Sequence, residues 1–252
     1  MKRLLVALLL VALSAGLAGQ AVAAAPPPGK GPPEFDKIVF VHYPKGELPG
    51  KPSGTPGKGG ESPYKYERYH WADTSLPVPY LVNLGGRGAS FLAGIQAGFQ
   101  TWENDPESDM DFEYGGTTTT GISSLSNGMD GLNVVGWADI SSSNPGAIAV
   151  TIYWYNRATK LVVEVDMALN TKGYTWWQNG TGDELWDIGN TSSAYDVDVQ
   201  NIITHEAGHW LVLGDLYNAN NSEQTMYGTS AEFELKKRSL NSGDIAGIRK
   251  IY

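Results

Sequence analysis

Two histidines and a glutamate, close together in the chain, are the residues best suited to chemistry. They lie in the run His205-Glu206-Ala207-Gly208-His209. Residues four apart share one face of an α-helix, so His205 and His209 can direct two imidazole nitrogens at one zinc ion. Glu206 lies one step around the helix, next to any water that the metal holds, where a carboxylate can act as general base. The spacing therefore predicts a metal-dependent hydrolytic site.

A third protein ligand is expected because a catalytic zinc takes three and leaves one position for water. The chain has four histidines, and none of them follows His209. Asp215 comes shortly after His209, just past Gly214, and is the nearest oxygen ligand. The alternative is that Asp215 is an ordinary loop residue, in which case the competing carboxylates are those of Glu223, Glu232 and Glu234.

The helix that would carry these ligands has recognisable ends and an apolar stripe. Asp196 or Asp198 can cap its N-terminus, and Gly214 is expected to end it. The two histidines lie off the apolar stripe, so they would face a cleft rather than the core. The stripe follows helical spacing and consists of Val199, Ile202, Ile203, Trp210 and Leu213.

The sequence from His205 to Asp215 resembles the long zinc motif of the metzincins, HExxHxxGxxH, with aspartate in place of the last histidine. Snapalysin-like proteases of that clan make the same replacement. The run Thr225-Met226-Tyr227-Gly228 resembles the matrixin Met-turn. Residues 239–252 are similar to the final matrixin helix, and residues 78–83 and 91–104 to the first strand and first helix.

The resemblance implies an α+β fold of the zincin type over residues 76–252. Such a matrixin-like domain would have a twisted, mixed, five-stranded sheet, about three helices, and an active-site helix that carries the HExxH motif. From the residues themselves we expect strands at 79–84, 111–114, 132–137, 147–155 and 161–169, and a helix at 90–103.

The same resemblance implies a zinc metalloendopeptidase. It would hold one catalytic Zn²⁺ through His205, His209 and Asp215, and would hydrolyse peptide bonds through a zinc-activated water with Glu206 as general base. Met226 would form an apolar floor beneath the metal, and Tyr227 would wall the pocket for the residue after the scissile bond. Residues 161–177 contain no histidine, so no structural zinc is expected.

One departure from the family motif leaves other functions open. Val212 stands where the motif has glycine, and a β-branched residue resists positive φ, so Gly214 would have to take the turn. An inactive zincin that acts as a secreted binding module is therefore the main alternative. A zinc amidase acting on other substrates is a weaker one.

Residues 1–23 read as a secretory signal, with Lys2 and Arg3 before an apolar stretch and Ala21-Val22-Ala23 as the cleavage sequence. We therefore expect a secreted, extracellular protein with no transmembrane span in the mature chain. The chain has no cysteine, which excludes disulfides and latency by a thiol. Its net charge of −9 argues against nucleic-acid and anionic-membrane partners. The expected partners are protein or peptide substrates, and the expected state is a monomer.

Residues 24–75 are rich in Pro, Gly and Lys and read as a linker or prosegment. Within them, residues 35–43 are apolar enough for one short strand. That strand would either extend the edge of the sheet or lie in the cleft with His42 at the open zinc position. Bound Ca²⁺ is a further candidate cofactor, either at Asp166 or at the acidic residues 103–111, although hydrogen bonding and a solvated turn are the simpler roles.

Overall fold

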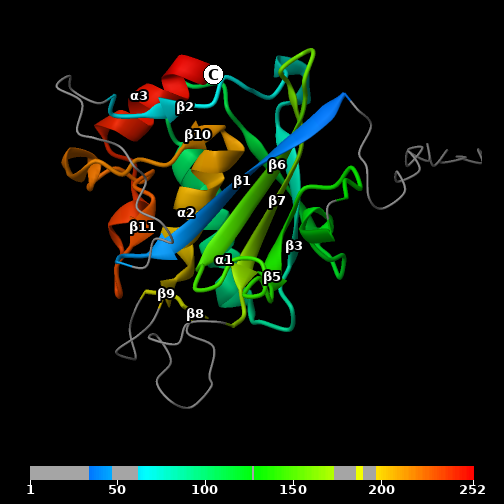
Figure 1. The fold of residues 1–252 in the computed structure, drawn as a ribbon, viewed down its shortest axis with the longest axis vertical. Coiled ribbons are helices and arrows are strands. Elements are labelled where there is room, and N and C mark those ends of the chain that lie inside the picture. Colours follow the sequence, from blue (N-terminus) through cyan, green and yellow to red (C-terminus); the bar gives the residue numbers. More distant parts are fainter. Residues whose placement is uncertain (1–33, 47–61, 127, 173–185, 190–196) are drawn as a thin grey trace, which may run out of the picture.

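The computed structural model describes residues 34–46, 62–126, 128–172, 186–189 and 197–252. This part of the chain forms an α+β fold with a mixed seven-stranded sheet and three α-helices (Figure 1). The predicted signal at residues 1–23 and the alternative helix cap Asp196 lie outside the described residues.

The main sheet has the strand order β11-β1-β6-β7-β5-β3-β4. Neighbouring pairs among β4, β3, β5 and β7 are parallel, whereas β6 runs antiparallel to β7 and to β1. The bounds of its strands are β1 (Phe35–Pro44), β3 (Val78–Asn83), β4 (Phe112–Thr117), β5 (Val134–Ala138), β6 (Ala149–Asn156), β7 (Val162–Asn170) and β11 (Thr229–Ser230). Two small sheets pair β2 (Lys65–Tyr66) with β10 (Leu213–Gly214) and β8 (Trp186–Asp187) with β9 (Val197–Asp198).

The number of strands differs from the expectation. Each of the five strands predicted for the domain is present, as β3 to β7, and the strand expected at residues 35–43 is β1. The prediction of a five-stranded sheet was wrong because β1 and β11 add to the edge formed by β6. Local alternation of apolar residues predicts that a segment is extended, but it does not say which strand the segment will pair with.

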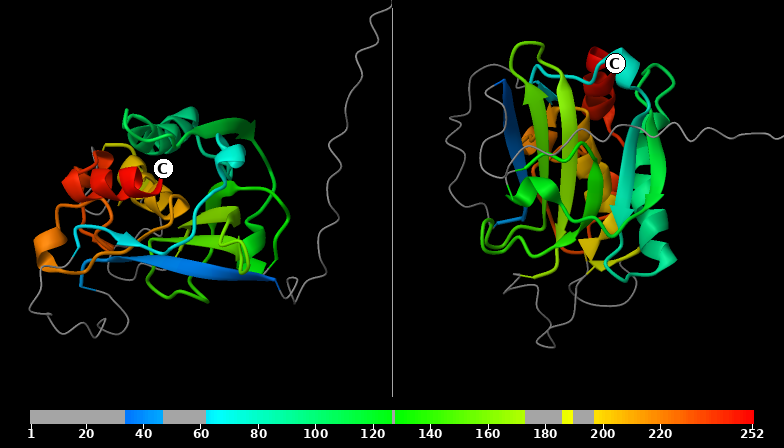
Figure 2. Two further views of the ribbon diagram at one scale, coloured as in Figure 1. Left: turned by 90° about the horizontal axis from the view of Figure 1, so that it is seen from above. Right: turned by 90° about the vertical axis from the view of Figure 1, so that its right-hand side faces the viewer.

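The helices α1 (Ala89–Glu103), α2 (Val199–Trp210) and α3 (Ser242–Ile251) lie on one side of the sheet (Figure 2). α1 and α2 approach closely at Gly98, where a Cβ atom would lie 2.4 Å from Cγ2 of Ile203. The indole N–H of Trp102 also donates to the carbonyl of Thr204 at 2.7 Å. The site-bearing helix α2 is therefore packed between α1 and the sheet, with its apolar stripe in the core.

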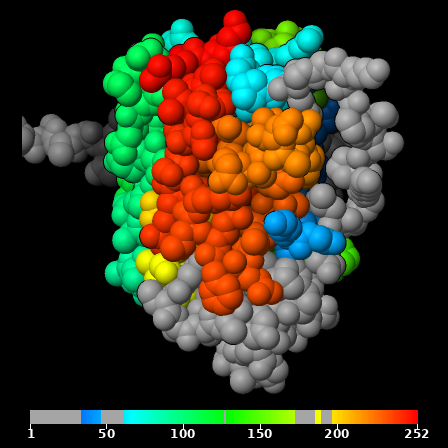
Figure 3. All heavy atoms as spheres, turned by 90° about the vertical axis from the view of Figure 1, so that its left-hand side faces the viewer, coloured from blue at the N-terminus to red at the C-terminus, as the bar shows by residue number. Residues whose placement is uncertain are grey.

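Described residues of the segment 24–75 pack on the domain. Phe40 of β1 and Trp71 are buried, and the indole N–H of Trp71 donates to the carbonyl of Trp210 at 2.8 Å. Figure 3 shows the end of β1, in blue, emerging beside the orange-to-red C-terminal segment. Within the described ranges, no helix is long and apolar enough to cross a membrane.

Candidate metal centre

The N-terminus of α2 is fixed by Asp198, whose carboxylate accepts from the N–H of Asn201 at 2.7 Å. The side chain of Arg238 donates to the same carboxylate through Nε at 2.8 Å. A capped helix of this kind holds successive side chains at defined angles around its axis. His205, Glu206 and His209 are thus placed by regular helix geometry, with exposed fractions of 0 to 1%.

Three potential ligand atoms converge beside α2. Oδ1 of Asp215 lies 3.2 Å from Nε2 of His205 and 3.5 Å from Nε2 of His209. A tetrahedral zinc with ligand bonds of about 2.0–2.1 Å separates its ligand atoms by about 3.3 Å. The three residues therefore form a group that is close enough to hold one metal ion.

The protonation of the two imidazoles fits a cation at this point. Nδ1 of His205 lies 2.7 Å from the carbonyl of Thr225, and Nδ1 of His209 lies 2.7 Å from the carbonyl of Leu213. Each Nδ1 must donate to its carbonyl, so in the neutral ring Nε2 carries a lone pair. Both Nε2 atoms and Oδ1 of Asp215 are buried without a hydrogen-bond partner. Three lone pairs that face one another in the protein interior repel, unless a cation lies between them.

The electrostatic surroundings are those of a tightly coupled group. Burial, followed by the charge of Lys237, lowers the pKa of His205 to about 3. Burial alone would lower the pKa of His209, but the carboxylate of Asp215 raises it. Burial alone would raise the pKa of Asp215, yet His209 and His205 hold it well below its usual value. The aspartate is therefore ionised and can contribute negative charge to a bound cation.

Glu206 is held beside these atoms by a residue of the sheet. The hydroxyl of Thr151, on β6, donates to Oε2 of Glu206 at 2.6 Å. Oε1 is buried and has no hydrogen-bond partner. Burial raises the pKa of Glu206 to about 7, against the opposing effects of His209 and Thr151. The carboxylate is thus oriented through one oxygen, and the other oxygen remains available to a proton.

The turn between His209 and Asp215 differs from the expectation. α2 ends at Trp210 rather than at Gly214, and Val212 itself takes the left-handed conformation, with φ of +62°. This backbone costs an L-residue about 1–2 kcal/mol, whereas the fully buried Val212 side chain stabilises the fold by a comparable amount. Gly214 lies instead in β10, where a Cβ would meet Oε1 of Glu67 at 2.5 Å.

Met226 packs against Gly208 of α2, and its role as a floor beneath a metal stays a prediction. A Cβ atom at Gly208 would lie 2.1 Å from Sδ of Met226, so the glycine in the middle of the HExxH run makes room for the sulfur. The turn is held from α3, where the carboxylate of Asp244 accepts from the N–H of Thr225 at 2.7 Å and of Met226 at 3.1 Å. Because the carbonyl of Thr225 orients His205, Asp244 supports the ligand through this loop.

Other residues singled out in the sequence lie away from the three ligand atoms. The metal-competent groups of the described chain include none of Glu223, Glu232 and Glu234. Tyr227 is partly buried next to Met226, and its N–H donates to the carbonyl of Gln224 at 3.1 Å. Tyr217 is the tyrosine that reaches Asp215. Its pKa is raised by burial, then by the charge of Asp215 and a hydrogen bond to it.

Sequence reasoning missed Thr151, Asp244 and Tyr217. None of the three belongs to a motif, and each acts on the site from a different element of the fold. A threonine in a strand or an aspartate three residues into a helix has an ordinary structural role in most proteins. Only the distances in the folded chain distinguish these residues.

Asp166, the candidate calcium residue, is a hydrogen-bond acceptor. Oδ1 accepts from the N–H of Val134 at 3.0 Å, and Oδ2 accepts from the N–H of Ser124 at 3.0 Å. Of the acidic residues 103–111, Asp105 forms an ion pair with Nε of Arg249 at 2.9 Å. These contacts satisfy both carboxylates without an ion.

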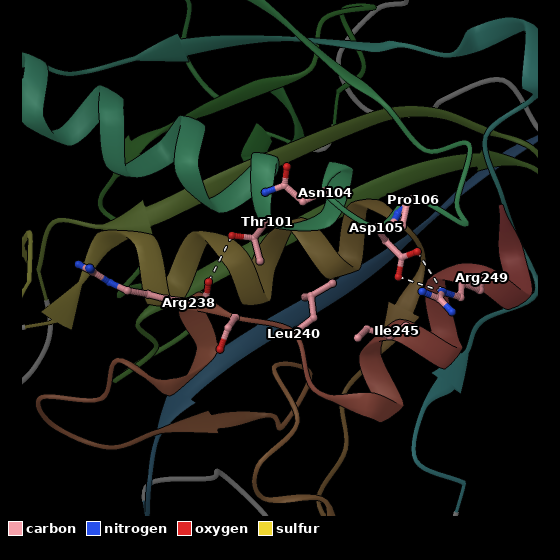
Figure 4. A pocket seen from close by; sticks show the side chains of 9 residues that line it. Thr101, Asn104, Asp105, Pro106, Arg238, Leu240, Ile245 and Arg249 are labelled. Carbon is pink, nitrogen blue, oxygen red and sulfur yellow. Dashed lines mark hydrogen bonds and ion pairs between the residues drawn. The ribbon is translucent and has the colours of Figure 1, made fainter.

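A surface pocket lies elsewhere, between the end of α1 and the C-terminal segment (Figure 4). Its charged residues are paired, since Arg249 holds Asp105 and the side chain of Arg238 donates to Asp198 through Nε at 2.8 Å. The hydroxyl of Thr101 donates to the carbonyl of Arg238 at 3.3 Å. Histidine is absent from its lining. The group at α2 is therefore the stronger candidate for chemistry.

Comparisons with known proteins leave the function to be argued from this geometry. Neither a scan against protein-family models nor a search of curated proteins finds a match for the chain.

Proposed function

We propose that this chain is a secreted zinc metalloendopeptidase with a metzincin-like, matrixin-like domain. One observation carries the proposal: Nε2 of His205, Nε2 of His209 and Oδ1 of Asp215 converge with their lone pairs unused. Two imidazoles and a carboxylate at tetrahedral separations are a set that suits catalytic zinc. The resemblance of residues 205–215 and 225–228 to the zinc motif and Met-turn supports the same assignment.

His205, His209 and Asp215 would hold the metal. When bound, zinc supplies a Lewis acid that polarises a carbonyl and lowers the pKa of water towards neutrality. The carbonyls of Thr225 and Leu213 fix the orientation of the two imidazoles, which is the usual task of groups behind metal ligands.

Glu206 is the proton carrier in this proposal. Thr151 holds Oε2, so the carboxylate cannot rotate freely, and Oε1 is left to accept a proton from the attacking water. The same oxygen can return that proton to the amine that leaves when the peptide bond breaks. Thr151 is a positioning residue, because it acts through Glu206.

Strand β6 offers the means of binding an extended peptide. It lies next to the site, since Thr151 is one of its residues, and its edge forms a backbone ladder with β1. Main-chain pairing with a sheet edge is a common way of recognising peptides irrespective of most of their side chains. Tyr227 would contact the residue after the scissile bond.

A second function is favoured by one observation. The ligand atoms are buried, and Phe40 of β1 stacks on the ring of His209 with centroids 3.9 Å apart. If β1 never leaves, the protein is an inactive zincin that binds metal and acts as a secreted binding module.

The test compares the wild type with Glu206→Gln, using Glu223→Gln as a matched control at an exposed glutamate. Metal content and casein hydrolysis in long incubations are measured on the same samples, with and without a chelator. We expect one zinc per chain in all three proteins. Hydrolysis should fall by about 10²–10⁴-fold in Glu206→Gln alone. Full hydrolysis by Glu206→Gln would refute the assignment of the base, and absence of metal from the wild type after zinc loading would refute the proposed centre.

A further inference from the structure

Strand β1 crosses directly over the candidate metal centre. It pairs antiparallel with β6 from Phe35 opposite Asn156 to His42 opposite Ala149. In Figure 1, β1 passes in front of α2. Two side chains of β1 lie against the histidines of α2. The Phe40 ring is stacked on His209 at 3.9 Å, and the His42 ring lies 4.1 Å from that of His205.

The ring of His42 has a free nitrogen that points into the centre. Its Nε2 lies 2.9 Å from Oγ of Ser230, and that hydroxyl donates to Oε1 of Glu234 at 3.4 Å. Since the hydroxyl proton goes to the carboxylate, Nε2 of His42 must be the donor to Ser230, and Nδ1 carries the lone pair. This Nδ1 is buried without a hydrogen-bond partner and lies 4.0 Å from Oε1 of Glu206.

His42 also lies close to His205, one of the three candidate ligands, and to Glu206. A ligand atom of His42 lies within 4.8 Å of ligand atoms of both His205 and Glu206. The three protein ligands of α2 and Asp215 leave one tetrahedral position open. The side of the centre that faces Glu206, where a reacting water must lie, is the side that His42 covers.

The backbone of β1 occupies the edge of β6 that lies beside the candidate centre. β1 lies between β6 and β11, pairing antiparallel with the first and parallel with the second. Phe40 is opposite Thr151, the residue that holds Glu206, so the ladder passes the centre itself. A peptide that adds to the same edge of β6 must therefore take the position of β1.

We propose that β1 is an inhibitory strand of this chain, which fills the peptide-binding edge of β6 and places Nδ1 of His42 in the fourth position on the metal. This inference rests on the proposed function. It explains how a chain with no cysteine restrains such a centre to a low rate, because an imidazole replaces the thiol as the blocking group. A peptide gains access when β1 is displaced or removed.

The first test counts ligands in the full wild-type chain loaded with one zinc ion. X-ray absorption of the bound zinc should show three imidazoles, from His205, His209 and His42, and His42→Ala should show two. Two imidazoles in the wild type would overturn the ligation by His42. This measurement on the wild type does not depend on whether a variant folds.

The second test measures access to the centre in His42→Ala, with Val39→Ala as the matched control. Val39 lies on the same strand but is 43% exposed, so it faces away from the centre. For His42→Ala we expect at least about tenfold faster release of zinc to a chelator, and at least about tenfold faster hydrolysis of a fluorogenic peptide, each a change of about 1.4 kcal/mol. Val39→Ala should match the wild type in both.

The outcomes separate the two proposals. Equal hydrolysis by the wild type and His42→Ala, with zinc bound to both, overturns the inhibitory role and leaves the peptidase in place. Zinc bound at full occupancy with three imidazoles, but no hydrolysis by any variant, overturns the proposed peptidase and supports the permanently closed zincin. Absence of zinc from every protein overturns both.

Discussion

Two buried acidic clusters lie on opposite faces of the sheet, and they differ in how their lone pairs are used. On the side away from the helices, Glu164 and Asp166 of β7 accept hydrogen bonds through all four carboxylate oxygens. On the helix side, Oδ1 of Asp215 and Nε2 of both His205 and His209 accept none. The first cluster is complete without an ion, whereas the second is close enough to hold one and has unused lone pairs.

This difference shows why the number of buried acids is a poor guide to metal sites. Backbone N–H groups of Ser124, Val134, Asp130 and Gly131 surround the first cluster and replace the hydration that its carboxylates lose. In the second cluster, backbone carbonyls accept hydrogen bonds from Nδ1 of each histidine. Nε2 of each ring therefore has no hydrogen-bond partner. The donors around a buried carboxylate therefore decide its role.

The largest expected effect is the loss of metal from Asp215→Ala. Removing a direct ligand should weaken zinc binding by more than the roughly 10–100-fold that loss of a supporting residue costs. Asp166→Asn is the matched control and should bind zinc like the wild type. Competition with a chromophoric chelator measures both affinities. Unchanged zinc affinity in Asp215→Ala would mean that another residue is the third ligand. The contrast between the two clusters would then no longer hold.

The next effect is on stability, in Asp166→Ala. The change leaves the buried N–H groups of Ser124 and Val134 without acceptors, at about 1–3 kcal/mol each. We expect the free energy of unfolding to fall by roughly 2–6 kcal/mol in urea titrations, with zinc affinity unchanged. The exposed Asp139→Ala serves as control. A fall of less than about 1 kcal/mol would mean that the cluster is not held by these bonds.

The free energy of unfolding should depend on pH through the titration of Glu164. Burial raises its pKa to about 7 against the opposing N–H donor of Gly131, and the charges of Asp166 and Asp130 add to the rise. The folded chain therefore binds more protons than the unfolded chain between about pH 4.5 and pH 7, so this contribution to stability is lost as pH rises through that window. At about 1.4 kcal/mol per unit, the loss amounts to roughly 3 kcal/mol.

The contribution of Glu164 is the difference in free energy of unfolding between the wild type and Glu164→Gln, measured as a function of pH. Both proteins are studied free of metal, so that metal release does not enter the measurement. The free energy of unfolding of Glu164→Gln should vary less with pH over this window. Parallel curves for the two proteins would show that Glu164 titrates at its ordinary value.

The smallest effect is that of the metal on stability. Free zinc at 100 times its dissociation constant should raise the free energy of unfolding by about 2.7 kcal/mol. A chelator should reverse that gain in thermal unfolding experiments. Addition of Ca²⁺ in place of zinc should produce no comparable gain, because the cluster at Glu164 and Asp166 has no free oxygen. A calcium-specific rise that Asp166→Asn abolishes would contradict this reading.

Local sequence rules were sufficient for the parts of the site that lie on one element. The spacing of His205 and His209, the Asp198 cap and the strands β3 to β7 all follow from residue type and period. Asp215 also lies beside both histidines in the folded chain, in a group close enough to hold a metal ion, and its role as third ligand stays a prediction.

What could not be predicted depends on backbone atoms and on pairing between distant segments. The carbonyls of Thr225 and Leu213 have no signature in residue type, although they orient both histidines. The turn at Val212 was assigned to Gly214 because glycine is the usual residue at positive φ, and burial of the valine outweighed that preference. The pattern of residues 35–43 also did not distinguish a strand that extends the edge of the sheet from a strand that lies in the cleft with His42 at the open zinc position.

Asp244 holds the loop before it through hydrogen bonds from the N–H groups of Thr225 and Met226, which has a consequence for biosynthesis. During vectorial synthesis the HExxH run leaves the ribosome well before α3 does, yet the carbonyl that aligns His205 belongs to a loop tethered by α3. In a nascent chain that ends before Asp244, the Thr225 loop therefore lacks this tether, and His205 lacks the alignment it provides. Alignment of His205 is thus a late event in synthesis, because it requires the helix at residues 242–251.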